Sequence, residues 1–364
     1  MRFHKDYFAL VILALVLQGC GLNKDATQIA PPEFFTSVPV RSGFGFHAPW
    51  LDLYFTDPVN PLSAREVGGI DAFVVTAIVA ARESVDVALR DLNLASVNNA
   101  LIVANRRGIP VRVVTESDSM TARSNFQGLR DAGIVVVEDQ QPGLMNNRFI
   151  VIDHKEVWTG SLSYDAAGVF REYNSLVRIL SPEIAANYTK EFNEMFETKQ
   201  FGPLIFPETP YPSVDIQGTQ VEVLFSPDDI VAARLGQLIS EAQQNIFFLA
   251  HVFTSPELGA NVRARATDGI PITGVLEFDR INPDVVEEAN FFRKAGLNIY
   301  LDPNPEVLNH AVMIIDGKIV VLGSYDFTSR AEYENDENVL IIHNEIVAQK
   351  FTEEFQRVQS RAQQ

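Results

Sequence analysis

The amino-acid sequence predicts an α/β protein that contains two copies of one domain, and three observations support this fold class. Short motifs recur at one constant separation along the chain, as in DHKEVWTGS (Asp153–Ser161) and DGKIVVLGS (Asp316–Ser324). Within each copy, strand-like segments alternate with helix-like segments, which is typical of an α/β sandwich. The composition, with 46% hydrophobic and 21% charged residues, is that of a globular protein with a packed core.

Other repeated residues share this register and rule out a short-period repeat. Ala132-Gly133 recurs as Ala295-Gly296 at the same separation, and Gly108-Ile109-Pro110 recurs as Gly269-Ile270-Pro271 at a slightly smaller one. Solenoid repeats run over about 20–50 residues, which is far shorter. Two long copies in nearly constant register therefore indicate a duplicated domain.

The elements of the first copy follow from the periodicity of its apolar residues. Helical spacing predicts a first helix at residues 70–81. The other elements are expected in alternation: a strand at 85–89, a helix at 93–107, strands at 110–114 and 134–137 with a helix between them, strands at 149–152 and 157–159, and a closing helix at 182–196. The second copy repeats this order, with Val347, Phe351, Phe355 and Val358 on one face of its closing helix.

The N-terminus has the features of a secretory signal. Arg2 and Lys5 precede an apolar run from Phe8 to Leu17. A run of about ten residues is too short to span a bilayer, which needs roughly 20, but it fits the core of a signal peptide. No other apolar stretch approaches that length, so we expect no transmembrane helix.

Cys20 is the only cysteine, and it directly follows this run in Leu17-Gln18-Gly19-Cys20. The segment resembles the lipobox of bacterial lipoproteins, which implies cleavage before Cys20 and acylation of its thiol and amine. Gly21 after the cysteine resembles sorting to the outer membrane. The alternative is an ordinary signal peptide with an incidental cysteine. We expect a protein of the cell envelope that contacts the membrane through a lipid anchor on Cys20.

Segments rich in proline and glycine mark the domain boundaries. We expect a signal peptide at residues 1–19, a tether at 20–45, a first domain at 46–200, a linker at 201–219 and a second domain at 220–364. The formal net charge of −18 repels polyanions, so it argues against nucleic acid as a partner.

The repeated motifs resemble the signature HxKxxxxDxxxxxxGSxN of the phospholipase D superfamily. The segments that match are NNRFIVIDHKEVWTGSLSYD, from residue 146, and NHAVMIIDGKIVVLGSYDFT, from residue 309. The segment AEYENDENVLII, with Glu332, Asn335, Glu337 and Asn338, also resembles the family. The resemblance implies two phospholipase D-like α/β sandwich domains, related by pseudo-twofold symmetry, whose motifs meet in one site.

The sequence departs from this signature at the residues that carry the chemistry. Asn146 and Asn309 occupy the two histidine positions, Arg148 and Ala311 the two lysine positions, and Ser163 and Asp326 the two final asparagine positions. The signature residues that are retained are the aspartates, Asp153 and Asp316, and the Gly-Ser pair that comes later in each motif, Gly160-Ser161 and Gly323-Ser324. The resemblance implies that these two aspartates tie a turn, and we expect the Gly-Ser pairs to serve close backbone packing.

In the family, one histidine attacks phosphorus and the other protonates the leaving alcohol. An asparagine amide is neither a nucleophile of this kind nor a titrating acid. Of the six histidines, His310 is next to Asn309, but alternation along a strand turns it away from the site. His154 lies in the turn after Asp153. No motif surrounds the other three, His47, His251 and His343.

We therefore expect a catalytically degenerate pseudoenzyme that acts in binding or scaffolding. Its ligand is expected to be a phosphate-bearing small molecule, held by Arg148, or a protein partner. The alternative is an active phospholipid phosphodiesterase or phosphatidyltransferase of the phospholipase D or cardiolipin synthase type, and a nuclease is a third hypothesis. Neither a metal nor another cofactor is expected, because the sequence lacks HExxH, CxxC and GxxxxGKS motifs.

Overall fold

The computed structural model describes residues 34–117, 122–203, 209–278, 283–302 and 305–363. The predicted signal peptide, Cys20 and Gly21 lie outside these ranges. None of the helices in the described ranges combines the length and the hydrophobicity that crossing a bilayer requires. Residues 34–363 belong to one compact unit built around two large sheets.

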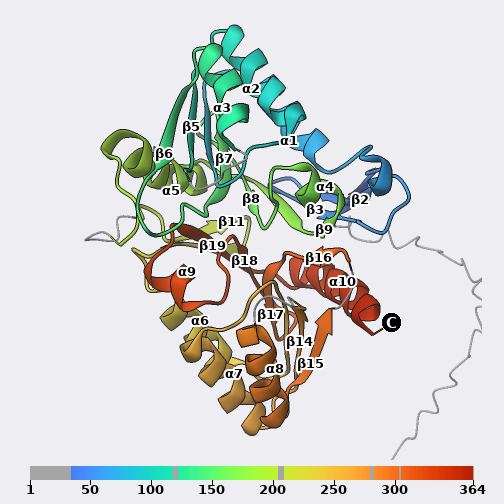
Figure 1. Cartoon of the computed structure of the whole chain (residues 1–364). Helices are drawn as coiled ribbons and strands as arrows, with labels where there is room; N and C mark the ends of the chain where they lie inside the picture. Colours follow the sequence, from blue (N-terminus) through green and yellow to red (C-terminus); the bar gives the residue numbers. More distant parts are fainter. Residues whose placement is uncertain (1–33, 118–121, 204–208, 279–282, 303–304, 364) are drawn as a thin grey trace, which may run out of the picture. The chain divides into compact units, whose positions relative to one another are not determined.

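The first sheet has nine strands in the order β1-β2-β3-β10-β8-β7-β4-β5-β6 (Figure 1). The bounds are β1 Thr36–Val38, β2 Gly43–His47, β3 Leu51–Thr56, β4 Val85–Leu89, β5 Val111–Glu116, β6 Val135–Asp139, β7 Arg148–Ile152, β8 Glu156–Gly160 and β10 Ser175–Leu180. Strands β4, β5 and β6 are parallel, whereas β7 pairs with β4 in the antiparallel sense.

The second sheet has eight strands in the order β11-β12-β19-β18-β17-β13-β14-β15. The bounds are β11 Ser213–Ile216, β12 Thr219–Ser226, β13 Ile246–Ala250, β14 Ile272–Glu277, β15 Asn298–Asp302, β17 Ala311–Ile315, β18 Ile319–Gly323 and β19 Glu337–His343. It repeats the topology of the first sheet, because β13, β14 and β15 are parallel and β17 is antiparallel to β13.

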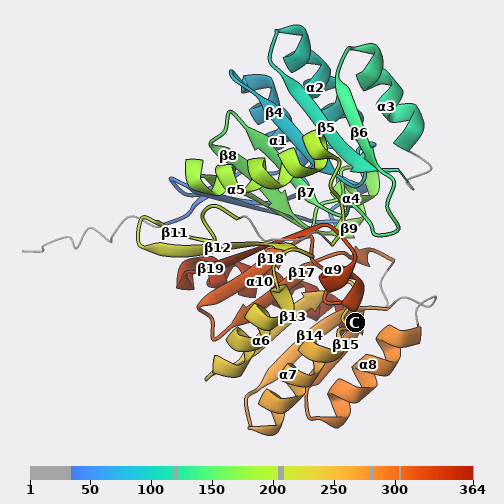
Figure 2. The same ribbon diagram turned by 90° about the vertical axis from the view of Figure 1, so that its left-hand side faces the viewer.

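Helices cover both faces of each sheet. On the outer face of the first sheet lie α1 (Asp71–Ala80), α2 (Ala95–Arg106) and α3 (Ala122–Asp131), and on that of the second lie α6 (Val231–Glu241), α7 (Pro256–Thr267) and α8 (Pro283–Lys294) (Figure 2). Between the sheets lie α5 (Pro182–Asn193), which continues as a π-helical turn (Glu194–Thr198), and α10 (Glu345–Ala362). The remaining helices are short: η1 (Ser63–Arg65), α4 (Ala166–Phe170) and α9 (Ser329–Tyr333).

One hydrophobic core joins the two halves. It contains side chains of both sheets together with Tyr188 and Phe192 of α5 and Phe351 and Phe355 of α10. The rings of Tyr188 and Phe225 pack edge to face with centroids 5.1 Å apart, across the two halves. The predicted α/β fold with two related halves is therefore confirmed, and the predicted strands and helices of the first copy match observed elements to within a few residues.

Two segments predicted to be irregular contain strands. The expected tether at 20–45 includes β1 and the start of β2. Gly43 does not mark a flexible segment, because its lack of a side chain lets β2 approach β3 closely. A Cβ on Gly43 would lie 2.5 Å from the carbonyl oxygen of Phe55. The expected linker at 201–219 includes β11, which forms a hairpin with β12 through Gln217 and Gly218, both with positive φ as such a turn requires.

The glycines of the two motifs are required by close backbone packing. A Cβ on Gly160 would lie 2.4 Å from the carbonyl oxygen of Ser175, and a Cβ on Gly323 would lie 2.0 Å from that of Asn338. Both residues also have φ values, 141° and 154°, that favour glycine. The packing role expected for the Gly-Ser pairs is confirmed.

Candidate functional site

Two reciprocal crossings bring the two motifs together. Strand β16 (Val307–Leu308) pairs with β9 (Glu172–Tyr173) of the other half, and Met145 makes the equivalent parallel bridge to Asp336. The residue that precedes each histidine position is thus paired with the opposite half. The backbone N–H of Asn146 donates to Asp336, and that of Asn309 donates to Tyr173, at 3.0 and 3.1 Å.

The amide of Asn146 is buried against a carboxylate of the second half. Its Nδ2 donates to both carboxylate oxygens of Glu337 at 2.9 Å, and its Oδ1 accepts from Nη1 of Arg90 at 3.3 Å. Glu337 also accepts from Ser324 and Asn335. The Asn146 amide is therefore a fixed hydrogen-bond donor within the interface.

The amide of Asn309 meets a neutral partner instead. Its Nδ2 lies 3.0 Å from Oδ1 of Asn174, 3.2 Å from the carbonyl oxygen of Ser161 and 3.3 Å from Oγ of Ser163. Asn174 precedes Glu337 by the same separation that relates Asp153 to Asp316, so the two occupy equivalent places. The second histidine position thus lacks the carboxylate that faces the first.

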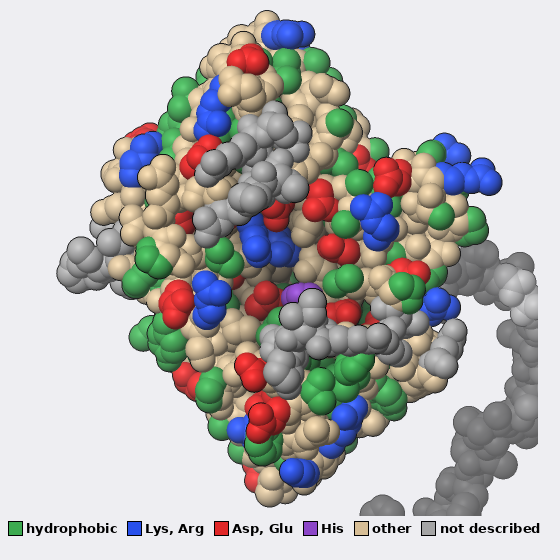
Figure 3. Space-filling view, viewed as in Figure 1, with side chains coloured by type: hydrophobic (Ala, Val, Ile, Leu, Met, Phe, Trp, Pro, Cys, Tyr) green, Lys and Arg blue, Asp and Glu red, His purple; other side chains and the backbone are tan. Residues whose placement is uncertain are grey.

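Charged side chains surround these amides. The guanidinium of Arg148 donates to the carbonyl oxygen of Ser161, the same oxygen that Asn309 reaches. Burial raises the pKa of the half-buried Asp326, against the opposing influence of His251, Arg148 and then Arg90. Figure 3 shows basic, acidic and histidine side chains gathered around a hollow between the two halves.

Two more carboxyl groups of this region hold their protons more tightly than usual. Burial raises the pKa of Glu337 to about 8, and the negative charge of Asp326 adds to the effect. Burial also raises the pKa of Glu172, against a hydrogen bond from Asn174. At neutral pH a large fraction of Glu337 is therefore protonated, so the site carries less negative charge than its carboxyl count indicates.

The structure separates the predicted site residues into two groups. Asn146, Arg148, Ser163, Asn309 and Asp326 lie in this region. Ala311 is a buried apolar residue of β17, paired with Ala250, and supplies no charge.

Asp153 and Asp316 lie at the other ends of β7 and β17, where they tie turns as expected. Asp153 accepts from the backbone N–H groups of residues 82–84, and Asp316 from those of residues 243–245. Burial opposes ionisation of Asp153, but the three backbone N–H groups outweigh it and hold its pKa below the ordinary value.

His310 points away from the site, as its place in the strand predicted. Its side chain is fully buried, and Nε2 pairs with Oε1 of Glu354 on α10 at 3.0 Å. His154 lies in the turn after Asp153, with Nε2 3.2 Å from Oγ of Ser84. Neither ring is available to the two asparagines.

His251, which has no motif around it in the sequence, lies beside Asn309 in the structure. It follows β13 directly, its backbone N–H donates to His310, and its Nδ1 lies 3.2 Å from the carbonyl oxygen of Leu308, next to Asn309. Arg90 directly follows β4, the equivalent strand of the first half. The sequence signal for Arg90 and His251 was their position directly after a predicted strand, because ligands bind beyond the carboxyl ends of parallel strands.

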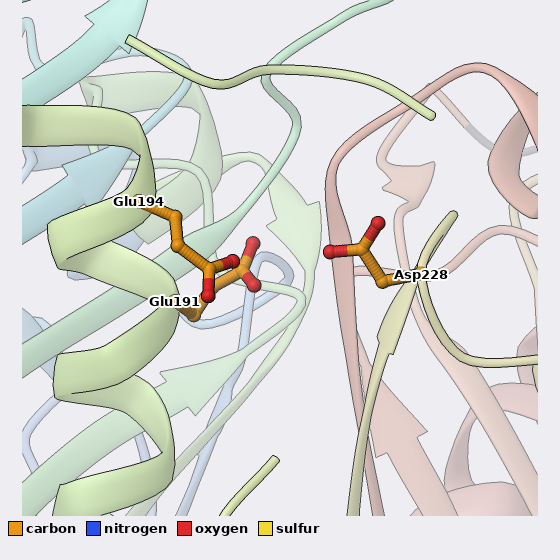
Figure 4. A group of neighbouring side chains, drawn as sticks. All are labelled: Glu191, Glu194 and Asp228. Atoms are coloured by element: carbon orange, nitrogen blue, oxygen red, sulfur yellow. The ribbon is translucent and has the colours of Figure 1, made fainter. Parts of the chain in front are cut away.

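An acidic group lies on α5, on the π-helical turn that follows it and on the loop after β12. Glu191, Glu194 and Asp228 have oxygen atoms within 4.8 Å of one another (Figure 4). Glu194 is paired with Lys190 at 2.8 Å, and Glu191 accepts from Asn147. Burial raises the pKa of Glu191 well above its ordinary value, and the negative charge of Asp336 adds to this.

The sequence pattern of the family described as "Cardiolipin synthase, PLD-like domain" matches residues 74–196 and 235–359, more than half of the chain. The protein therefore belongs to this family of phospholipase D-like proteins, with one domain in each half. Each matched segment contains one of the two motifs.

Characterised relatives match parts of the chain. The mitochondrial cardiolipin hydrolase of Homo sapiens is 32% identical over 131 residues, 36% of this chain and 51% of that protein, so the chain spans about half its length. The phospholipase D of Rickettsia conorii is 28% identical over 200 residues, 53% of this chain and 96% of that protein. In fold, the chain is similar to phosphatidylserine synthase of Haemophilus influenzae, with a TM-score of 0.61, 12% identity, and coverage of 91% of this chain and 88% of that one.

The raised pKa of Glu337 predicts that the protein loses stability as the pH rises. The folded state keeps a proton that the unfolded chain releases near its ordinary value, so the contribution is complete below about pH 4 and is lost through about pH 8. Glu337→Gln mimics the protonated form. It should reduce the decrease in the free energy of unfolding between about pH 4 and pH 8 by about 1–4 kcal/mol, measured by urea unfolding at a series of pH values. Exposed Glu83→Gln is the control, and an equal slope in Glu337→Gln and wild type would contradict the assignment.

Proposed function

We propose that this protein binds a phosphodiester in the hollow between its halves and does not form the phosphohistidine of phospholipase D chemistry. The observation that carries the proposal is the state of the two histidine positions. Both hold asparagine amides, and each amide is engaged by groups of the opposite half. A phosphoryl group cannot be carried on such an amide, because its nitrogen lone pair is delocalised.

The charges around the site support binding of a singly charged phosphodiester. Arg148, Arg90 and His251 lie close enough to influence Asp326, and an arginine can bind two phosphate oxygens at once. Asp326 opposes an anion whenever it is ionised. A phosphodiester carries one negative charge, so it should be tolerated better than a phosphomonoester dianion.

Isothermal titration with glycerophosphocholine and glycerophosphoglycerol should detect binding by the wild-type protein. Arg148→Ala should weaken binding about tenfold or more, about 1.4 kcal/mol. Asp326→Asn should strengthen it, because a negative charge is removed. Arg65→Ala, at an exposed arginine elsewhere, is the matched control. Binding that is absent from wild type, or indifferent to Arg148, would remove the proposal.

An active phosphodiesterase is the second candidate, because the relatives are described as phospholipase D and cardiolipin hydrolase and because His251 borders the site. The carbonyl of Leu308 can only accept, so it favours the tautomer with the proton on Nδ1 and leaves Nε2 with its lone pair. This nitrogen would attack phosphorus, and a protonated carboxyl such as that of Glu337 would give its proton to the leaving alcohol.

Restoring the family residues should separate the two candidates. Asn146→His, Arg148→Lys, Ser163→Asn, Asn309→His, Ala311→Lys and Asp326→Asn, made together, should create turnover of phosphatidylglycerol or bis-p-nitrophenyl phosphate that wild type lacks. Adding Asn174→Glu should raise the rate further, because it gives the second imidazole the carboxylate that Glu337 offers the first. Turnover by wild type that disappears in His251→Ala would favour the second candidate instead.

The proposed location is the bacterial cell envelope, with the lipid anchor on Cys20. Its support is the position of the single cysteine behind an apolar run of signal-peptide length. Metabolic labelling with palmitate should mark the wild-type protein and not Cys20→Ser, which should leave the membrane fraction. A wild-type protein that is unlabelled and released would show that Cys20 is incidental, and density fractionation would assign the membrane.

A further inference from the structure

A second pocket lies in the first half, between α1 and strands β3, β8 and β10. Its volume is about 470 Å³, within the range of small-molecule sites. Asp153, at the end of β7 opposite Arg148, forms part of its wall. Strand β7 separates this pocket from the phosphodiester site by roughly 13 Å along the chain direction.

The floor of the pocket is a buried network of charges. Arg178 lies between two carboxylates, with Nη1 3.2 Å from Oδ2 of Asp52 and Nη2 2.7 Å from Oε2 of Glu156. Trp158 donates to Oε1 of Glu156 at 2.7 Å. The Arg178 side chain is still 20% exposed, and these two bonds use two of its five N–H groups, so it can donate to a ligand.

Aromatic and small side chains form the walls. The rings of Tyr54 and Phe73 are stacked with centroids 4.4 Å apart, and Tyr54 is stacked on Trp158 at 5.9 Å. Phe73 belongs to α1, and Ala77 and Ala80 of the same helix also line the pocket, where their short side chains leave it open. The pocket therefore offers apolar surface beside charged groups.

The second half lacks most of this network, although Glu222, the counterpart of Asp52, forms its own ion pairs with Arg234 and His343 at 2.7 and 2.6 Å. Arg178 pairs with Asp52 and Trp158 across the sheet, and Ile341 pairs with Glu222 and Val321 at the equivalent places. One half thus has arginine and tryptophan where the other has isoleucine and valine.

Glu156 likewise corresponds to Ile319, because the two begin the equivalent strands β8 and β18. Burying an ion pair costs desolvation that well-packed apolar residues avoid, often by about 1–4 kcal/mol. Since Ile319, Val321 and Ile341 maintain the same strands, we infer that Glu156, Trp158 and Arg178 of the first half serve a ligand.

The charges of the pocket restrict that ligand to a neutral one. Asp52, Glu156 and Asp153 would repel an anion. Arg178 occupies the place between two of these carboxylates that a cation would otherwise take, and Arg82 and Lys155 also line the pocket. A wholly apolar ligand would cut off the partly exposed guanidinium of Arg178 from water and leave its other N–H groups without partners.

A saccharide meets these conditions, because its hydroxyl groups both donate and accept and its ring has an apolar face. We propose that this pocket binds a sugar unit, independently of the phosphodiester site.

Titration of the full chain by saturation-transfer NMR with glucose, galactose, N-acetylglucosamine and maltose should test the proposal. At least one sugar should bind saturably, with a Kd of about 1 mM or below. Inorganic phosphate and tetramethylammonium serve as the anionic and cationic probes. Saturable binding of either of these at the pocket, or of none of the sugars, would overturn the assignment.

Matched variants on α1 should locate the binding. Ala80→Trp fills the pocket and should weaken sugar binding at least tenfold, whereas Val79→Trp adds the same ring at an exposed neighbour that does not line the pocket and should leave it unchanged. If near-ultraviolet circular dichroism shows that Ala80→Trp is unfolded, Thr76→Trp at the exposed rim replaces it. Equal sugar affinity in the pocket-filling variant and in Val79→Trp would overturn the proposal.

Discussion

The reciprocal crossing of the two halves is the constraint on which the site depends. Each motif strand is preceded by a residue that pairs with the opposite half, Met145 with Asp336 and Leu308 with Tyr173. These backbone pairings place residues 146 and 309 at the interface between the halves, independently of the type of side chain at either position. The geometry of a two-motif site is therefore specified by main-chain hydrogen bonds and does not depend on which side chains occupy these two positions.

Within that geometry the two halves have diverged unequally. Glu337 faces Asn146 and accepts four hydrogen bonds from side chains, whereas the equivalent residue facing Asn309 is Asn174. A carboxylate can orient an imidazole and stabilise its cation, and an amide can do only the first. The position of Asn146 thus has a carboxyl group as its partner, whereas that of Asn309 has an amide.

The duplication and the alternation of strands and helices were visible in the sequence, because both depend on local patterns. The asparagines at positions 146 and 309 could also be predicted to depart from the family signature, because their spacing from Asp153 and Asp316 identifies these two positions. Arg90 and His251 were missed because no motif surrounds them and only the parallel arrangement of β4 and β13 brings them to the site. The strands β1, β2 and β11 were missed because glycine and proline were interpreted as signs of an irregular chain, whereas Gly43 permits close packing and Gly218 forms a hairpin turn.

The hydrophobic layer between the sheets explains why the fold tolerates such changes. That layer is built from apolar residues of both halves, α5 and α10, and none of the altered motif positions belongs to it. A substitution at these positions leaves the apolar contacts of the layer intact, so stability imposes little restraint on the motif. The buried carboxyl groups of Glu337, Asp336 and Glu191 are different, because their raised pKa values tie the interface to protonation. The apolar layer therefore sets the fold, while the raised pKa values of these carboxyl groups make its stability depend on pH.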